Sequence, residues 1–257
     1  MQNRRLKAVI FDVDGTLGET ERHGHRVAFN RAFEQLGMDD RWDEEMYGKL
    51  LRVTGGERRL KHYFVDYAGR PAKEAAELAA KLHPVKTDLF LRVVEEGKVP
   101  PRPGVLRFIR DLAEDGLRLA VATTGTAAWV DPLLRKLCAL GGLKPFEVLV
   151  TGDQVVERKP DPEAFNLALE RLDLGAGDVV IVEDSKNGVQ AAKAAGCVCL
   201  AVQGEYADPA ELQRAELVVD DFGEPGSRIE VLHNPLGVEV GEMLTHQVVH
   251  RLHSAAG

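Results

Sequence analysis

The chain has 257 residues, 44% of them hydrophobic, and a formal net charge of -8 at pH 7. This length suits one large domain or a core with a smaller inserted domain, and the hydrophobic content is enough to bury a core. The acidic excess argues against nucleic acid and anionic membranes as partners, because both favour a positive protein surface. An anionic substrate is still allowed, since a metal ion or a single lysine can reverse the field inside one pocket.

The cysteines and the hydropathy of the chain bear on its compartment. Cys138, Cys197 and Cys199 show no metal-binding spacing, so we expect small buried thiols in a reducing cytoplasm. The first apolar run has only four residues before Asp12, which is too short for a signal peptide. No stretch approaches the roughly 20 apolar residues of a membrane helix. We therefore expect a cytoplasmic protein.

The first hundred residues contain one predicted strand and a helical block. The strand, 7–11, is apolar from residue 8 onward, as a strand covered on both faces should be. Apolar residues at helical spacing then predict helices at 25–36, 44–53 and 72–96. Thr54-Gly55-Gly56 ends the second of these helices, and three prolines within 100–104 mark a stiff linker.

Beyond the linker, predicted strands and helices alternate. The strands are at 117–122, 147–150, 179–182, 198–202 and 217–219, and the helices at 105–114, 129–140, 162–172 and 186–195. Such alternation predicts a parallel sheet with helices on both faces, to which the first strand also belongs. We therefore expect an α/β core at 1–17 and 101–224, a helical insert at 18–100, and a C-terminal extension at 225–257 with a strand near 228–232 and a helix near 241–252.

Two carboxylates directly follow the first strand, where ligands of open parallel sheets bind. Asp12 and Asp14 are two residues apart, so both side chains can face one site. Two adjacent carboxylates repel, so either one is neutral or a divalent cation holds both, which suits attack on a phosphate. A surface turn is the ordinary alternative. A calcium loop is excluded, because Leu17 and His23 stand where such a loop needs Gly and Glu.

Three further polar signals lie near predicted strand ends. Glu183 and Asp184 follow the strand at 179–182, and they are either metal ligands or part of a helix cap. Lys159 is either a turn residue or the cation that neutralises a phosphate and stabilises Asp12. Thr123 is the weakest signal, although its hydroxyl and the amides that follow it could hold phosphate oxygens.

In this order, Asp12-x-Asp14-Gly15-Thr16, Thr123, Lys159 and Glu183-Asp184 resemble the four motifs of the haloacid dehalogenase superfamily. The match spans residues 1–17 and about 101–222. The resemblance implies a Rossmann-like parallel-sheet core, with residues 18–100 as an inserted α-helical cap domain.

The insert is similar to that of CbbY-type phosphatases and, more distantly, of beta-phosphoglucomutase. The residues that carry this likeness are Glu19-Thr20-Glu21, His25-Arg26-x-Ala28-Phe29-Asn30, Trp42, Tyr47 and Leu51-Arg52-Val53-Thr54-Gly55-Gly56. The resemblance implies a phosphatase of xylulose-1,5-bisphosphate. The family's cap loop reads T-G-G-K-E-R, whereas Glu57 stands here at the lysine position, so that Arg58 or Arg59 takes over its role or the substrate differs.

The resemblance also implies a mechanism. Asp12 attacks phosphorus, Asp14 is the acid and base, and Thr123 and Lys159 neutralise charge. The implied cofactor is Mg²⁺, held by Asp12, the Asp14 backbone carbonyl and Asp184 with Glu183 beside it. The implied substrate-binding residues are Glu21, His25, Tyr47, Gly55, Gly56, Arg59, Thr124 and Asn187.

Two alternatives to a phosphatase stay open. A phosphomutase would use the same core but return the phosphate to the sugar. A non-catalytic sugar-phosphate-binding protein would keep the fold alone, while a dehalogenase is less favoured because it has no use for the Asp14 acid. The expected partner is a small phosphorylated sugar, with no nucleic acid and no membrane, and we expect a monomer or a weak homodimer.

Overall fold

The computed structural model describes residues 5–53 and 55–257. Thr54, which the sequence analysis places in the loop after the second helix, lies outside the described residues. The chain divides into two compact units, one formed by Pro101–Gly257 with the residues up to Glu19 and the other by Thr20–Pro100. We call them the core unit and the helical unit. The predicted domain boundaries, after residues 17, 100 and 224, stay a prediction.

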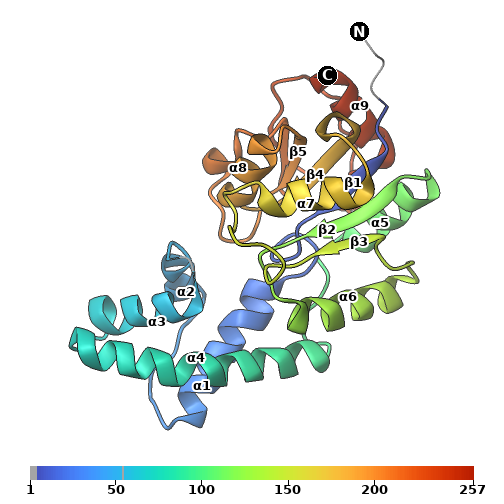
Figure 1. The fold of residues 1–257 in the computed structure, drawn as a ribbon. Coiled ribbons are helices and arrows are strands. Elements are labelled where there is room, and N and C mark those ends of the chain that lie inside the picture. The colour runs from blue at the N-terminus through green and yellow to red at the C-terminus, as the bar shows by residue number, and fades with distance from the viewer. Residues whose placement is uncertain (1–4, 54) are drawn as a thin grey trace. The chain divides into compact units, whose positions relative to one another are not determined.

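The core unit contains one sheet of seven strands, counted over the described residues, in the order β3-β2-β1-β4-β5-β6-β7 (Figure 1). Its strands are β1 (Ala8–Phe11), β2 (Arg118–Ala122), β3 (Val148–Val150), β4 (Val179–Glu183), β5 (Val198–Val202), β6 (Leu217–Val219) and β7 (Val231–His233). The pairs from β3 through β6 are parallel, and β7 is antiparallel to β6. The predicted parallel α/β sheet is confirmed, with one antiparallel strand added at its edge.

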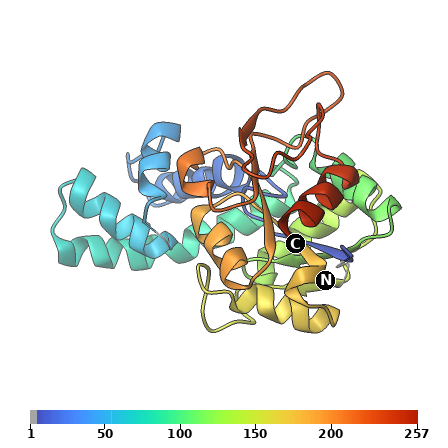
Figure 2. The ribbon, with the colours of Figure 1, turned by 90° about the horizontal axis from the view of Figure 1, so that it is seen from above.

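Helices cover both faces of this sheet, which agrees with β1 being apolar throughout and β4 being apolar up to Glu183. They are α5 (Val105–Glu114), α6 (Ala127–Gly141), α7 (Glu163–Leu172), α8 (Lys186–Ala194) and α9 (His246–Ala256). Ile10 of β1 belongs to the core cluster that includes residues of α7 and α8. The next residue, Phe11, instead contacts Phe108 of α5, with ring centroids 6.2 Å apart. Figure 2 shows α7 (yellow) and α9 (red) on opposite sides of the strands.

The C-terminal segment is part of the core unit rather than a loose tail. Its helix contacts β4, β5 and α5. Two hydrogen bonds join it to α5 and the residue that follows α5: His246 Nδ1 lies 2.9 Å from Asp111 Oδ1, and His250 Nε2 lies 2.7 Å from Asp115 Oδ2. Both the strand and the helix begin later than predicted from the sequence. For the helix, the amide of Leu244 donates to the carbonyl of Phe222 at 2.9 Å, so this stretch is bound to the core before α9 begins.

The helical unit packs around aromatic side chains. It contains the π-helical turns η1 (Glu21–His25) and η2 (Tyr63–Tyr67) and the helices α1 (Arg26–Gln35), α2 (Glu44–Leu50), α3 (Gly56–His62) and α4 (Ala72–Glu95). Trp42 is fully buried between Phe29 and Phe33. Asn30 fixes the Trp42 backbone, because its side-chain amide donates to the Trp42 carbonyl at 2.8 Å and accepts from the Trp42 amide at 2.7 Å.

Helix α3 was not predicted from the sequence, and α2 ends at Leu50, three residues before the predicted end. Gly55 has φ +93°, a conformation that favours glycine, and it directly precedes Gly56, the first residue of α3. A pair of glycines therefore marked a helix–helix junction where we expected only a break. Among the described residues, no helix is both long enough and apolar enough to cross a membrane.

We predict that Leu252→Ala destabilises the core unit by about 2–4 kcal/mol, because it leaves a cavity at a buried position of α9. Leu252 is fully buried, whereas Ser254 of the same helix is exposed. The measurement is unfolding by denaturant, with Ser254→Ala as the matched control, which should change stability by less than about 0.5 kcal/mol. Equal stability of the two variants would show that α9 does not contribute to the core.

Candidate active site

A buried lysine joins two carboxylates at the carboxyl end of the central strands. Lys159 Nζ donates to Asp12 Oδ1 at 2.6 Å, to Glu183 Oε1 at 2.5 Å and to the carbonyl of Ala122 at 2.9 Å. Lys159 is 8% exposed, Asp12 is 5% exposed and Glu183 is fully buried. Charges buried to this degree persist only when they are paired and hydrogen-bonded, and these three groups satisfy one another.

The register of the sheet explains why these groups meet. Phe11 of β1 lies opposite Val121 of β2 and Val182 of β4. The next residue along each of these parallel strands is Asp12, Ala122 or Glu183, and each of the three contacts the lysine. Parallel strands end on the same side of a sheet, so residues far apart in sequence converge there.

Asp184 brings a third carboxylate to this cluster. Oxygen atoms of Asp12, Glu183 and Asp184 all lie within 4.8 Å of one another, and the Thr16 hydroxyl donates to Asp184 Oδ1 at 3.3 Å. Gly15 has φ +74°, and a Cβ there would lie 2.1 Å from Asp184 Oδ2. The turn after β1 therefore needs glycine both for its backbone conformation and for its contact with the carboxylate.

Burial and neighbouring charges shift the pKa values of the cluster. Burial raises the pKa of Asp12 to about 8; Glu183 and Asp14 add to this rise, and Lys159 opposes it. Burial, followed by the neighbouring Glu183 and Asp12, raises the pKa of Asp184 well above its usual range. Burial alone would favour the neutral amine of Lys159, but the charges of Asp12 and Glu183 outweigh it and raise that pKa. Three carboxylates around one ammonium are suited to a hard divalent ion such as Mg²⁺.

Glu183 also organises the first turn of α8. Its Oε2 accepts from the amide of Asp184 at 3.1 Å and from the Ser185 hydroxyl at 3.2 Å. Ser185 is the residue that caps α8, since its hydroxyl accepts from the Gly188 amide at 3.1 Å. Both oxygens of Glu183 thus have partners in the protein, and Asp184 is not the capping residue.

The remaining predicted residues of the core unit lie on the loops next to this cluster. Thr123 directly follows β2, is fully buried, and accepts at Oγ1 from the Gly125 amide at 3.1 Å. Thr124 is half-buried, as is Asp14 in the turn after β1. Asn187 is half-buried in the first turn of α8. The structure places these residues beside the strand ends that carry Asp12 and Glu183, without assigning them a role.

In the helical unit, three of the predicted residues form one chain of contacts. The Tyr47 hydroxyl donates to Glu21 Oε2, and Arg59 NH1 donates to the same hydroxyl oxygen at 3.1 Å. Arg59 is 8% exposed, and its Nε donates to the Leu50 carbonyl at 3.2 Å. Gly55 precedes α3 and Gly56 is its first residue, where a Cβ would lie 2.8 Å from His83 Nε2.

His25 belongs to a second group, which includes a lysine that the sequence analysis missed. Lys86 Nζ lies 2.9 Å from His25 Nδ1, and the His25 ring lies on Phe90 with centroids 3.9 Å apart. Lys86 is 7% exposed. A signal for it existed in the sequence, because it interrupts the apolar stripe of α4 at helical spacing between Leu82 and Phe90.

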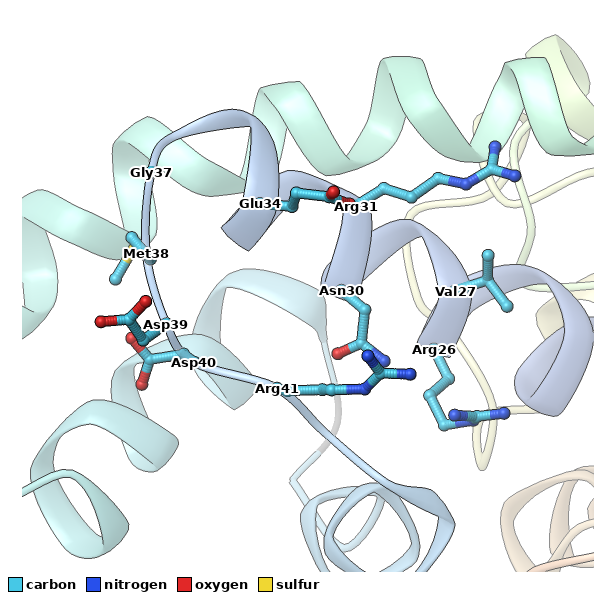
Figure 3. A pocket seen from close by; sticks show the side chains of 10 residues that line it. All are labelled: Arg26, Val27, Asn30, Arg31, Glu34, Gly37, Met38, Asp39, Asp40 and Arg41. Atoms are coloured by element: carbon cyan, nitrogen blue, oxygen red, sulfur yellow. The ribbon is translucent and has the colours of Figure 1, made fainter.

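A pocket elsewhere in the helical unit does not resemble an anion or cation site. Figure 3 shows its lining along α1 and the segment that follows: Arg26, Val27, Asn30, Arg31, Glu34, Gly37, Met38, Asp39, Asp40 and Arg41. The lining carries three arginines and three carboxylates, and Arg26 pairs with Glu44 at 3.5 Å. Because the charges balance, the lining indicates no preferred ligand, and the carboxylate cluster is the candidate active site.

Comparison with known proteins shows the family of the chain. The family model of haloacid dehalogenase-like hydrolases matches residues 6–196. Protein CbbY of Cereibacter sphaeroides is 40% identical over 221 residues, which cover 86% of this chain and 94% of that protein. The resemblance stated from the motifs is therefore confirmed.

Solved structures are similar in fold. A CbbY variant from Rhodobacter sphaeroides, crystallised in complex with xylulose-1,5-bisphosphate, has a TM-score of 0.68 at 39% identity and covers 84% of this chain and 94% of its own. Beta-phosphoglucomutase from Clostridium difficile has a TM-score of 0.62 at 19% identity, with 84% and 91% covered. This second likeness concerns the fold alone.

We predict that Gly188→Ala destabilises the core unit by about 1–3 kcal/mol, the usual effect of overpacking. A Cβ at Gly188 would lie 1.9 Å from the Glu183 carboxyl carbon, and Lys159 and Ser185 prevent that carboxylate from moving away. Denaturant unfolding measures the effect. The control is Gly241→Ala, since nothing lies within 4 Å of a Cβ there. If the two variants unfold alike, the packing of Glu183 is looser than described.

Proposed function

Because the chain belongs to the haloacid dehalogenase-like hydrolase family and is a phosphatase, we propose that it hydrolyses a small sugar bisphosphate with the help of Mg²⁺. The proposed substrate is xylulose-1,5-bisphosphate. The observation that supports this most is the buried Asp12 carboxylate, bound by Lys159 within a cluster of three carboxylates. A carboxylate held this way at a strand end is suited to act as a nucleophile towards phosphorus.

The proposed reaction has two steps. An oxygen of Asp12 attacks phosphorus and forms an aspartyl phosphate, while the bond to the sugar oxygen breaks and Asp14 gives that oxygen its proton. Asp14 then takes a proton from water, which attacks the aspartyl phosphate, releases inorganic phosphate and restores Asp12. Lys159 and the Thr123 region neutralise and position the phosphoryl oxygens, which is the main requirement of phosphoryl transfer.

The residues present fit a resident Mg²⁺. Asp12, Asp184 and the Asp14 backbone carbonyl would hold it, with Glu183 beside them, and all of these are oxygen donors. When bound, the ion supplies charge neutralisation for the phosphate and the attacking carboxylate. The raised pKa values of Asp12 and Asp184 are the features that support this fit, because a cation is what would restore both carboxylates to their ionised form.

The helical unit offers candidates for the sugar and the distal phosphate. Arg59, Tyr47 and Glu21 present a guanidinium, a hydroxyl and a carboxylate in one hydrogen-bonded chain. Glu57, at the position where related cap loops carry lysine, forms an ion pair with Lys61 at 2.7 Å. Its charge is thus countered by a neighbour, and the exposed Arg58 remains available as a second cation for the distal phosphate.

We predict that Asp12→Asn lowers phosphate release by at least about a thousandfold, because an amide cannot form the acyl phosphate. The measurement is phosphate release from a panel of sugar phosphates that includes xylulose- and ribulose-bisphosphates. Asp173→Asn is the matched control, since this residue has φ +53°, which Asn also tolerates, and lies at the end of α7.

The same experiment separates the alternatives. Turnover by Asp12→Asn comparable to wild type would exclude the nucleophile. Conversion of beta-glucose-1-phosphate to glucose-6-phosphate without phosphate release would indicate a mutase. No hydrolysis of any panel member by the wild type would favour a binding protein.

We also predict that Mg²⁺ binds more tightly as the pH rises towards about 8. The pKa of Asp12 is raised to about 8, so below that pH a proton competes with the metal, and the affinity falls by up to about tenfold per pH unit for each proton displaced. Calorimetry in two buffers with different ionisation enthalpies measures the protons released. Asp12→Asn should release fewer protons when it binds Mg²⁺. An affinity independent of pH between about 6 and 8, with no proton release, would contradict the prediction.

A further inference from the structure

Arg102 is a buried cation in the core unit whose hydrogen bonds all go to backbone carbonyls of the described residues. It is 8% exposed. NH1 donates to the carbonyls of Gly15 at 2.9 Å and Gln203 at 3.1 Å, while NH2 donates to those of Gln203 at 3.1 Å and Asp220 at 3.2 Å. One guanidinium thereby joins the turn after β1 to the segments that follow β5 and β6.

Two of these bonded segments form the walls around the Asp184 carboxylate. A Cβ on Gly15 would lie 2.1 Å from Asp184 Oδ2, and a Cβ on Gly204 would lie 2.4 Å from the same atom. Arg102 binds the carbonyl of Gly15 itself and the carbonyl of Gln203, the residue before Gly204. The position of each wall therefore depends on the same side chain.

The backbone next to Arg102 strengthens this connection. The Arg102 amide donates to the carbonyl of Leu17 at 3.1 Å, and Pro101 forms a β-bridge with Gly18. Arg102 is thus held against the loop of Asp12 and Asp14 by its backbone as well as by its side chain. The proline-rich stretch, predicted only as a linker, thus places a guanidinium against the turn after β1.

We propose that Arg102 is a positioning residue of the metal site, which sets the distance between the turn after β1 and Asp184 so that their oxygens converge on one cation. This inference depends on the proposed Mg²⁺ dependence. Arg102 does not touch the substrate or the reacting atoms in this scheme. Its planar guanidinium can bind three carbonyls at once, whereas the single ammonium of a lysine cannot reproduce that geometry.

The chain offers a matched control in Arg107. This arginine also binds three carbonyls in the core unit: NH1 donates to Leu244 at 2.8 Å, and NH2 to Phe222 at 2.9 Å and Gly223 at 3.0 Å. None of these carbonyls belongs to the two walls around Asp184. Arg102→Lys and Arg107→Lys each remove a guanidinium that binds three carbonyls, and they differ in whether those carbonyls belong to the segments around Asp184.

The test is Mg²⁺ binding to the full chain by calorimetry without substrate, together with denaturant unfolding. Arg102→Lys should weaken Mg²⁺ binding by about 10- to 100-fold, the usual effect of losing a group that orients a ligand. Arg107→Lys should lose comparable stability and keep the wild-type affinity. In steady-state kinetics, Arg102→Lys should raise the Mg²⁺ concentration needed for half-maximal rate. It should change kcat at saturating Mg²⁺ less.

A second variant guards against a folding failure of Arg102→Lys. Gly204→Ala leaves the guanidinium in place but inserts a methyl group against Asp184 Oδ2, and it should also weaken Mg²⁺ binding. Arg102→Lys with affinity within about twofold of wild type, or an equal loss in Arg107→Lys, would overturn the proposal. Wild-type protein that neither binds Mg²⁺ nor releases phosphate would instead refute the proposed function itself, and with it the role of Arg102.

Discussion

The core unit depends on the contact of one buried ammonium with two buried carboxylates. Lys159 lies between Asp12 and Glu183 and is 8% exposed. Removing one member of such a group leaves an uncompensated charge inside the protein, which is costly. The central strands must therefore end in register, and α8 must begin where Glu183 can accept from Ser185. A requirement for charge balance thus dictates the local geometry of β1, β4 and α8.

The same contact leaves the site short of positive charge. Lys159 serves two carboxylates, and Asp184 lies beside them with a pKa well above its usual range because of burial and its acidic neighbours. A site of this kind is suited to a divalent ion together with an anionic substrate, because the positive charge of the ion offsets both the carboxylates and the negative charge of the substrate. The charge of Arg102 opposes the rise in the pKa of Asp184, and in our proposal its hydrogen bonds to backbone carbonyls position the turn.

The two units divide the chemistry between them in the proposed scheme. The core unit carries the residues of a general phosphate-transfer reaction. The helical unit carries a different kind of arrangement, in which Glu21, Tyr47 and Arg59 hold one another around a buried aromatic core. Such a chain of polar groups has a defined shape, so it is suited to recognise one sugar phosphate among many. The loop that leads to Arg59 differs from related cap loops at Glu57, where those loops carry lysine.

The sequence by itself determined the sheet, the order of its elements and the motif residues, because apolar strands and the polar residues that follow them are local patterns. It also predicted, from polar residues near strand ends, that Lys159 could stabilise Asp12 and that Glu183 could serve the same site, and the family resemblance favoured these interpretations over a turn and a helix cap. Tertiary structure alone decided that Lys159 binds both carboxylates, that Arg102 braces the turn around Asp184, and that Lys86 lies on His25. These contacts join residues 24 to 147 positions apart, and no local pattern encodes which distant carbonyl or carboxylate a buried cation will meet.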